Sequence, residues 1–171
     1  MSTIPAEGLI LGIDPGTATT GYALVAEDVD GEVKLLCCGV LVTSATCAMP
    51  RRLLTIHQGV AALIARWSPE ALAIEELFFS RNVSTALSVG QARGVVLLAA
   101  AQAGLDIFEY KPAEVKQALV GYGSAGKRQM QEMLRLMLGL ETAPRPDDAA
   151  DAVAVAICHL HSARMRKLEN V

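Results

Sequence analysis

The segment RPDDAADAVAVAICHL, residues 145–160, limits the possible fold more than any other part of this 171-residue sequence. Its run of alanine and valine predicts a buried helix over residues 148–166, yet Asp147, Asp148 and Asp151 stand at its start. Asp148 and Asp151 are three residues apart, so on a helix they lie on one face within the first turn. A helix that packs into the core would therefore carry two carboxylates to the edge of that core.

Two further acids close strands elsewhere in the chain. LILGIDPGT predicts an apolar strand that ends at Asp14 before a Pro-Gly turn, and Glu75 closes the strand predicted at ALAIE. In an α/β sheet, ligands gather at the carboxyl ends of strands. If the helix that begins near Asp148 abuts these strand ends, the carboxylates of Asp14, Glu75, Asp148 and Asp151 converge.

Four carboxylates a few ångströms apart cannot all stay ionised without a counter-charge. Hard oxygen ligands without a paired His or Cys favour Mg²⁺ or Mn²⁺ over zinc. Two such ions about 3.5–4 Å apart would activate a water and stabilise the leaving oxygen during attack on a phosphodiester. Helix capping, worth roughly 0.5–2 kcal/mol, is the alternative. It is preferred for Asp147, which follows Pro146 as an N-cap, and it stays open for one of the other two acids of this helix.

The remaining elements follow from the hydrophobic pattern. GYALVAEDVDGEVKLLCCGVLVT predicts an antiparallel meander, with a strand, a turn at Asp30-Gly31, a second strand and a third strand. Further helices are expected over residues 50–67, 84–103, 112–120 and 127–138, with a strand at DIFEY and a loop at GYGSAG. The order βββαβαβααα predicts an α/β fold, a mixed sheet flanked by helices.

Composition and charge limit the class of protein. With 52% hydrophobic and 19% charged residues, the chain can form one core, so we expect a single domain over residues 1–171 with flexible ends at 1–7 and about 166–171. The start of the chain shows no signal peptide, and no uncharged 18-residue run spans a membrane, which predicts a cytoplasmic protein. The four cysteines lack CxxC spacing and are expected to be buried and reduced, with Cys37 and Cys38 on opposite faces of a strand.

The net charge of −3 argues against a nucleic-acid partner, but its distribution is uneven. Residues 1–75 hold 4 Lys/Arg and 8 Asp/Glu, whereas residues 76–171 hold 11 and 10. The basic side chains of the second part either line one groove or are scattered over the surface; they include Arg81, Arg93, Lys111, Lys116, Lys127 and Arg128.

Four segments, taken in order, resemble the RuvC family of Holliday-junction resolvases: LGIDPGTATTGYAL, AIEELFFSRNVSTALSVGQARG, FEYKPAEVKQALVGYGSAGKRQM and PDDAADAVAVAICH. The resemblance covers most of residues 8–160. It implies an RNase H-like fold of the retroviral integrase superfamily and a homodimer. It also implies Mg²⁺-dependent paired nicking of four-way DNA junctions during recombination and repair, with 5′-phosphate products. A branch-migration complex of the RuvA and RuvB type is the implied partner.

The resemblance also implies roles for single residues. The catalytic and metal-binding acids correspond to Asp14, Glu75, Asp148 and Asp151, which would hold two ions of Mg²⁺ or Mn²⁺. The expected DNA-binding residues are Phe78, which would stack on a base, together with Arg81, Lys116, Lys127 and Arg128. Phe79 is expected to pack in the core. Glu76 and Asp147 stand where the family requires no acid, and the GTATTGY loop lacks a basic residue that some members carry.

Four other interpretations are weaker. GYGSAGKR nearly matches a nucleotide-binding loop, but the segment before it predicts a helix and Arg128 replaces the Ser/Thr that would hold Mg²⁺. His159 and His161 lie two apart, so they are expected to pack or face solvent rather than share a metal.

GIDPGT also resembles the first phosphate loop of sugar kinases and actin-like ATPases, which need two domains and a longer chain. A non-catalytic RNase H-like module is disfavoured by the complete set of acids. The helix over 84–103, rich in small residues, is our candidate subunit interface, and burial inside one subunit would explain its composition nearly as well.

Overall fold

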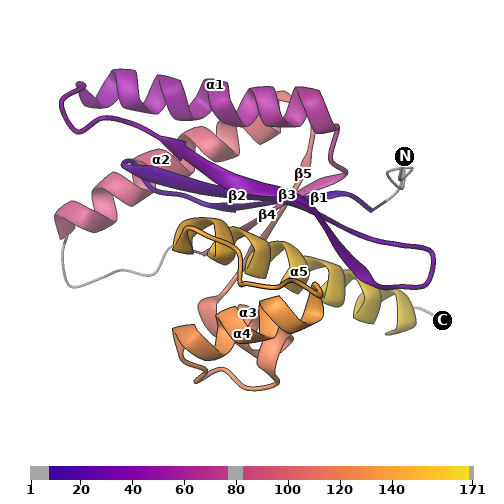
Figure 1. Ribbon diagram of the computed structural model, residues 1–171. Coiled ribbons are helices and arrows are strands. Elements are labelled where there is room, and N and C mark those ends of the chain that lie inside the picture. Colours follow the sequence, from indigo (N-terminus) through magenta and orange to yellow (C-terminus); the bar gives the residue numbers. More distant parts are fainter. Residues whose placement is uncertain (1–7, 77–82, 170–171) are drawn as a thin grey trace.

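The computed structural model describes residues 8–76 and 83–169, and the predicted order of elements is confirmed in this part of the chain. A central sheet lies between two layers of helices (Figure 1). The sheet contains β1 (Ile10–Asp14), β2 (Thr19–Glu27), β3 (Val33–Val42), β4 (Ala71–Glu75) and β5 (Asp106–Tyr110). The helices are α1 (Met49–Trp67), α2 (Val83–Gln102), α3 (Pro112–Val120), α4 (Lys127–Met137) and α5 (Asp147–Glu169).

The sheet is mixed, as the sequence predicts, with strand order β3-β2-β1-β4-β5. β2 pairs antiparallel with both β1 and β3, whereas β4 runs parallel to β1 and to β5. β1, β2 and β3 are the three leading strands of the predicted order. The meander segment itself holds two strands, β2 and β3, rather than three, because β3 pairs with β2 over its whole length with a single register shift, between Leu24 and Val25.

Alternating side chains of the sheet pack into two separate hydrophobic cores, one on each face, as expected for pleated strands that are covered on both faces. Leu11, Ile13 and Leu72 face α1 and α2, while Ile10, Ala23 and Ala73 face α5 with α3 and α4. The prediction that the adjacent cysteines lie on opposite faces is confirmed, since Cys37 packs against the first core and Cys38 against the second. All four cysteines are free thiols, but the predicted burial is confirmed only for Cys158. Cys37 and Cys38 are half-buried, and Cys47 is exposed because it precedes α1 in a surface loop.

One helix in the described part of the chain, α2, is long and apolar enough to cross a membrane by length and composition alone. In the fold it packs against the sheet through Ala92, Val96, Ala99 and Ala100. Its middle also carries Arg93, which forms an ion pair with Glu109 of β5. α2 is thus placed as a surface helix of the domain, with one apolar side left uncovered.

Candidate active site

The start of α5 lies directly on β1 and β2 because two glycines leave room for it. A Cβ on Gly12 would overlap the carbonyl oxygen of Ala152, and a Cβ on Gly21 would overlap that of Asp148. Gly21 is also the register partner of Asp14 at the end of β1. The backbone of Asp148 therefore sits next to the strand end that carries Asp14.

Glu75 reaches the same edge through the parallel pairing of β1 with β4. Ile13 pairs with Ile74 in register, so Asp14 and Glu75 are the next residues of two neighbouring parallel strands. Since the carboxyl ends of parallel strands meet at one edge of a sheet, both acids lie where an α/β sheet places its ligands. This confirms the predicted proximity of the two strand ends.

The pKa values show that the four acids, called the acidic cluster below, act on one another. Burial raises the pKa of Asp14 from 3.8 to about 7, with further increases from the negative charges of Asp151, Asp148 and Glu75. Burial, followed by the charge of Asp151, raises the pKa of Glu75. Burial likewise raises the pKa of Asp151, although Lys127 opposes it. The sequence brings Asp14, Glu75, Asp148 and Asp151 into one electrostatic unit.

Two lysines line the same side of this cluster. Lys116 and Lys127 border a cavity of about 190 Å³ together with Glu75 and Asp151. The Lys127 Nζ lies 3.0 Å from Asp147 Oδ2 and 3.8 Å from Asp151 Oδ2. The hydrogen bond to Asp147 is the largest cause that raises the pKa of Lys127. The two lysines expected at DNA phosphates thus lie beside the acids expected to bind metal.

Asp147 is not the N-cap that the sequence suggests. It is the first helical residue of α5, and the carbonyl oxygen of Pro146 accepts hydrogen bonds from Ala149 and Ala150. Its carboxylate instead accepts a hydrogen bond of 2.9 Å from Gln131 Nε2 of α4, besides the contact with Lys127. The Asp147 carboxylate is therefore paired with two donors on α4.

The donor set of the acidic cluster fits a hard divalent cation. All four groups are carboxylates, and a bound cation would offset the mutual repulsion that helps to raise the pKa of Asp14. Within residues 8–76 and 83–169, no three His, Cys, Asp or Glu side chains are grouped so as to hold an ion between them. Mg²⁺ does not require such a cage, because it keeps several waters and commonly takes one or two carboxylates together with substrate phosphate oxygens.

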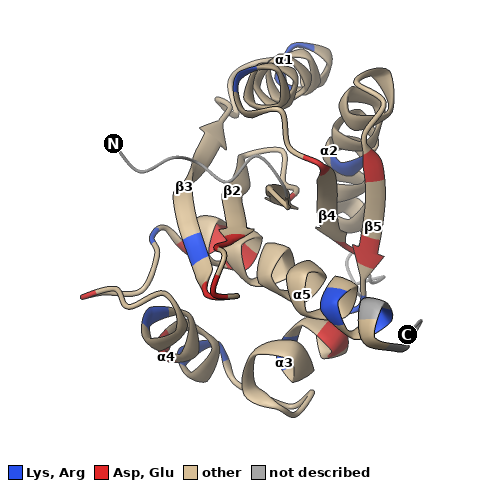
Figure 2. Cartoon of the chain, turned by 90° about the vertical axis from the view of Figure 1, so that its right-hand side faces the viewer, with Lys and Arg blue, Asp and Glu red and all other residues tan. Residues whose placement is uncertain are grey.

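Of the other residues predicted to bind DNA, only Arg128 lies in the described part of the chain. Phe78, Phe79 and Arg81 lie outside the described residues. Arg128 is exposed on α4, near Glu132. Lys and Arg are spread over helices on both sides of the sheet (Figure 2), so a single groove does not gather them all.

Arg93 has a role that the sequence did not indicate. Its guanidinium pairs with Glu109, and its Nε donates a long hydrogen bond of 3.5 Å to the backbone carbonyl of Glu75. This contact ties α2 to the strand end that carries an acid of the cluster. A charge pair between residues 16 apart on different elements leaves no local pattern that could have predicted it.

The GYGSAG loop and the two histidines have the structural roles predicted for them. The GYGSAG loop follows a helix, α3, rather than a strand, which excludes the architecture of a nucleotide-binding loop there. His159 Nδ1 is hydrogen-bonded to the buried Tyr110 hydroxyl at 2.8 Å, and His161 Nδ1 lies 3.1 Å from the carbonyl of Ala118. Both histidines therefore have the packing roles expected of them.

Comparison with known proteins identifies the family. A family model described as crossover junction endodeoxyribonuclease RuvC matches residues 10–159. The protein of that name from Roseiflexus sp. (strain RS-1) is 61% identical over 160 residues, which are 93% of this chain and 95% of the relative. The one from Chloroflexus aggregans is 60% identical over 153 residues, 90% of this chain and 93% of the relative.

Solved structures agree with this assignment. Thermus thermophilus RuvC in complex with Holliday junction substrate superimposes with a TM-score of 0.88 at 42% identity, covering 94% of this chain and 97% of that one. The yeast mitochondrial Holliday junction resolvase Ydc2 has the same fold, with a TM-score of 0.73 at 16% identity, covering 99% of this chain and 85% of that one. The mixed sheet with its two helical layers is thus the expected RNase H-like fold, and the chain belongs to the RuvC family.

Proposed function

We propose that this protein is a Holliday-junction resolvase, a metal-dependent endonuclease that makes symmetric paired nicks in four-way DNA junctions during recombination and repair. The observation that carries the proposal is the geometry at one edge of the sheet. Asp14 and Glu75 end two neighbouring parallel strands there, and the start of α5, which carries Asp148 and Asp151, packs directly on β1 and β2. Family membership adds the reaction class, hydrolysis of a DNA phosphodiester. We propose that the products carry 5′-phosphates. We further propose that residues 1–171 form one nuclease domain and that it works in the cytoplasm.

The acidic cluster would hold the metal. We propose two Mg²⁺ ions, replaceable by Mn²⁺, which when bound would activate water and stabilise the leaving oxygen. Asp14 is the most strongly perturbed acid of the cluster, so its carboxylate stands to gain most from a cation. The glycine contacts beneath α5 fix Asp148 and Asp151 relative to Asp14, so little rearrangement is needed at the moment of reaction.

The chain's own cations would orient the DNA. Lys116 and Lys127 lie beside Glu75 and Asp151, where their ammonium groups can donate to phosphate oxygens that approach the cluster. Arg128, exposed one residue further on α4, would extend this contact. For Phe78 and Arg81 the proposed base and phosphate contacts rest on the family resemblance.

Two nicks placed symmetrically require two active sites related by a two-fold axis, and one chain supplies one cluster. We propose a homodimer formed through an outer stripe of α2, made of Val83, Leu87, Gly94 and Leu98. Val83 is 78% exposed, Leu87 64% and Leu98 50%. Their spacing puts them on one face of the helix, and open space around Gly94 leaves room for a second backbone. We also propose a branch-migration complex of the RuvA and RuvB type as a partner.

The deciding experiment incubates purified protein with a synthetic four-way junction in which each strand carries a different label. We expect paired nicks in opposite strands that require Mg²⁺, do not require ATP and leave ends that a DNA ligase reseals. A linear duplex of the same sequence is the matched control and should remain intact. Binding of the junction without nicking would support the non-catalytic module instead, and nicking of duplex and junction alike would contradict a junction-specific enzyme.

A further inference from the structure

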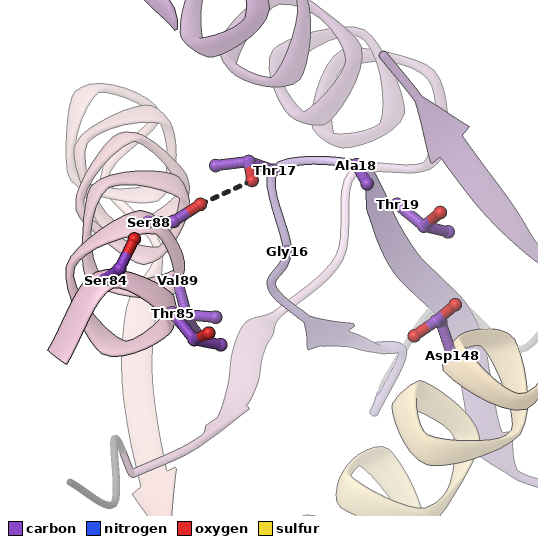
Figure 3. Close-up of a pocket in the computed structure, with 9 residues that line it drawn as sticks. All are labelled: Gly16, Thr17, Ala18, Thr19, Ser84, Thr85, Ser88, Val89 and Asp148. Atoms are coloured by element: carbon purple, nitrogen blue, oxygen red, sulfur yellow. Dashed lines mark hydrogen bonds between the residues drawn. The ribbon is translucent and has the colours of Figure 1, made fainter. Parts of the chain in front are cut away.

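A second cavity, called the hydroxyl pocket here, adjoins the acidic cluster and has no role in the mechanism above. Its volume is about 440 Å³, and it lies between the β1–β2 turn and the start of α2 (Figure 3). Five of its lining side chains carry hydroxyls: Thr17, Thr19, Ser84, Thr85 and Ser88. Asp148, a member of the acidic cluster, lies across the pocket from Ser88, so the same space borders both features (Figure 3).

Two hydroxyls are joined at the inner wall of the pocket. Thr17 Oγ1 and Ser88 Oγ lie 2.6 Å apart and form a hydrogen bond between residues 71 positions apart in the chain. Each hydroxyl has one proton, and their mutual bond uses only one of the two. The pair can therefore donate one further hydrogen bond to an acceptor in the pocket, in whichever direction the internal bond runs.

The wall that carries this pair is fixed from behind. The Thr43 hydroxyl donates to the carbonyl of Thr17, and Arg52 Nε donates to the Thr43 hydroxyl at 2.8 Å. The Thr20 hydroxyl donates to the carbonyl of Gly16 at 2.7 Å and closes the turn. The donor is thus held in place before any ligand arrives, which reduces the entropy lost on binding.

The lining indicates the kind of ligand. Among the described residues, no lining side chain is aromatic or basic, so these side chains would neither stack on a base nor attract an anion from a distance. Serine and threonine hydroxyls are ordinary partners of DNA phosphate and sugar oxygens. Thr17 and Ser88 lie across the pocket from the carboxylate of Asp148, so a phosphate that they bind is kept away from that negative charge.

We propose that the hydroxyl pocket holds one phosphodiester of the cleaved strand, next to the reacting one, through a hydrogen bond from the Thr17–Ser88 pair. This rests on the proposed function, because the strand must pass the acidic cluster for its neighbouring phosphate to reach the pocket. The contact fixes the register of the strand, so that one phosphodiester and not the next faces Asp14 and Asp148. Thr17 and Ser88 are thus positioning residues that act through the substrate backbone.

The test replaces single phosphates of the junction by neutral methylphosphonates, one position at a time on both sides of the cut. With wild-type protein, we expect one neighbouring position at which this change slows single-turnover cleavage about tenfold, the size of one hydrogen bond to a charged group. In the double variant Thr17→Val/Ser88→Ala, which removes both hydroxyls that could donate, cleavage of the unmodified junction should be about tenfold slower. At that one position the methylphosphonate should cause no additional loss. Thr55→Val, which removes an exposed hydroxyl that donates to the carbonyl of Arg51 within α1, is the control and should behave like wild type.

The outcomes separate the inference from the function beneath it. If the double variant cleaves at the wild-type rate, or if it cleaves slowly but keeps the full methylphosphonate penalty, the pocket does not bind the strand. The second result would show that the hydroxyls only brace the turn against α2. If wild-type protein cuts no junction at all, the proposed function fails first and the inference falls with it. If the double variant unfolds, Ser88→Ala, which changes a partly exposed side chain, provides the test: it removes the partner that orients the Thr17 hydroxyl, so the methylphosphonate penalty should fall.

Discussion

α5 and α2 are both apolar helices rich in small residues, and they pack on opposite faces of the same sheet. Every residue from 152 to 160 in α5 is buried, and two glycines of the sheet let its backbone approach closely. In α2, burial is limited to Ala92, Val96, Ala99 and Ala100, while the outer stripe stays exposed. Similar composition therefore serves two purposes. One helix holds Asp148 and Asp151 against the sheet, and the other leaves an apolar face exposed, which we propose meets a second subunit.

The largest effect is expected at the start of α5. Asp148→Asn keeps the shape of the side chain but removes a charge of the acidic cluster, so we expect single-turnover cleavage to fall by at least about 1,000-fold, on the scale of a lost metal contribution. Junction binding measured by gel shift in Ca²⁺ should stay within a few-fold of wild type. Asp30→Asn, in the exposed turn after β2, is the matched control and should cleave normally.

A substitution in β2 can disrupt the contact between α5 and the sheet. Gly21→Ala forces a methyl group into the carbonyl of Asp148, so we expect a loss of several kcal/mol in the free energy of unfolding, together with most of the cleavage. Urea denaturation monitored by circular dichroism measures it. Gly123→Ala makes the same chemical change in the loop after α3, where the nearest atom to the new methyl group, the Cβ of Ala113, lies 3.4 Å away, so it should leave the fold unharmed. Equal destabilisation by both substitutions would contradict the close approach of α5.

A charge placed in the outer stripe of α2 tests whether this stripe is the dimer interface. Leu98→Asp should shift the protein from dimer to monomer in analytical ultracentrifugation, and it should reduce paired nicking about tenfold or more, because a charge buried in an interface is costly. Leu136→Asp on α4 changes a leucine that is 57% exposed, compared with 50% for Leu98, and should leave the dimer intact. If the Leu98→Asp protein still sediments as a dimer, the dimer interface does not lie on the outer stripe of α2.

The smallest expected effect is a pH dependence of metal-free protein. Asp14 titrates at about 7 when folded and near 3.8 when unfolded, so the folded state holds the extra proton between these values. The contribution of Asp14 to stability is therefore greatest below about pH 4 and is lost as pH rises toward 7. His159 acts in the opposite direction, because its folded pKa is lowered to about 4 by burial. His159 contributes equally to the pH dependence of wild type and of Asp14→Asn, so its contribution cancels when the two are compared. Their difference in free energy of unfolding should shift in favour of Asp14→Asn as pH rises.

Much of this could be predicted from the sequence, because it is encoded locally. Asp14 and Glu75 stand directly after apolar strand segments, and Asp148 and Asp151 share one helix face by spacing alone. The bounds of α3 were predicted to the residue, since Pro112 and Gly121 mark its two ends. Period and terminal signals are properties of neighbouring residues, so a single sequence reveals them.

What could not be predicted depends on which surfaces meet. The pairing of Asp147 with Lys127 and Gln131 is decided by the docking of α4 on α5, and without it an N-cap was the better prediction. The Thr17–Ser88 pair joins residues 71 positions apart. The difference between buried α5 and half-exposed α2 follows from Gly12 and Gly21 in the sheet rather than from the helices themselves.

Binding of Mn²⁺ offers the most direct test of the central claim, that Asp14, Glu75, Asp148 and Asp151 form one cation site. Electron paramagnetic resonance can count free Mn²⁺ in the presence of protein and a junction whose scissile phosphates are made uncleavable. We predict tight binding by wild type and a loss of affinity of at least about tenfold when each acid in turn is replaced by its amide, since each would remove a charged ligand. If any one of the four amides binds Mn²⁺ and cleaves the natural junction as wild type does, that acid stands outside the site and the account is wrong.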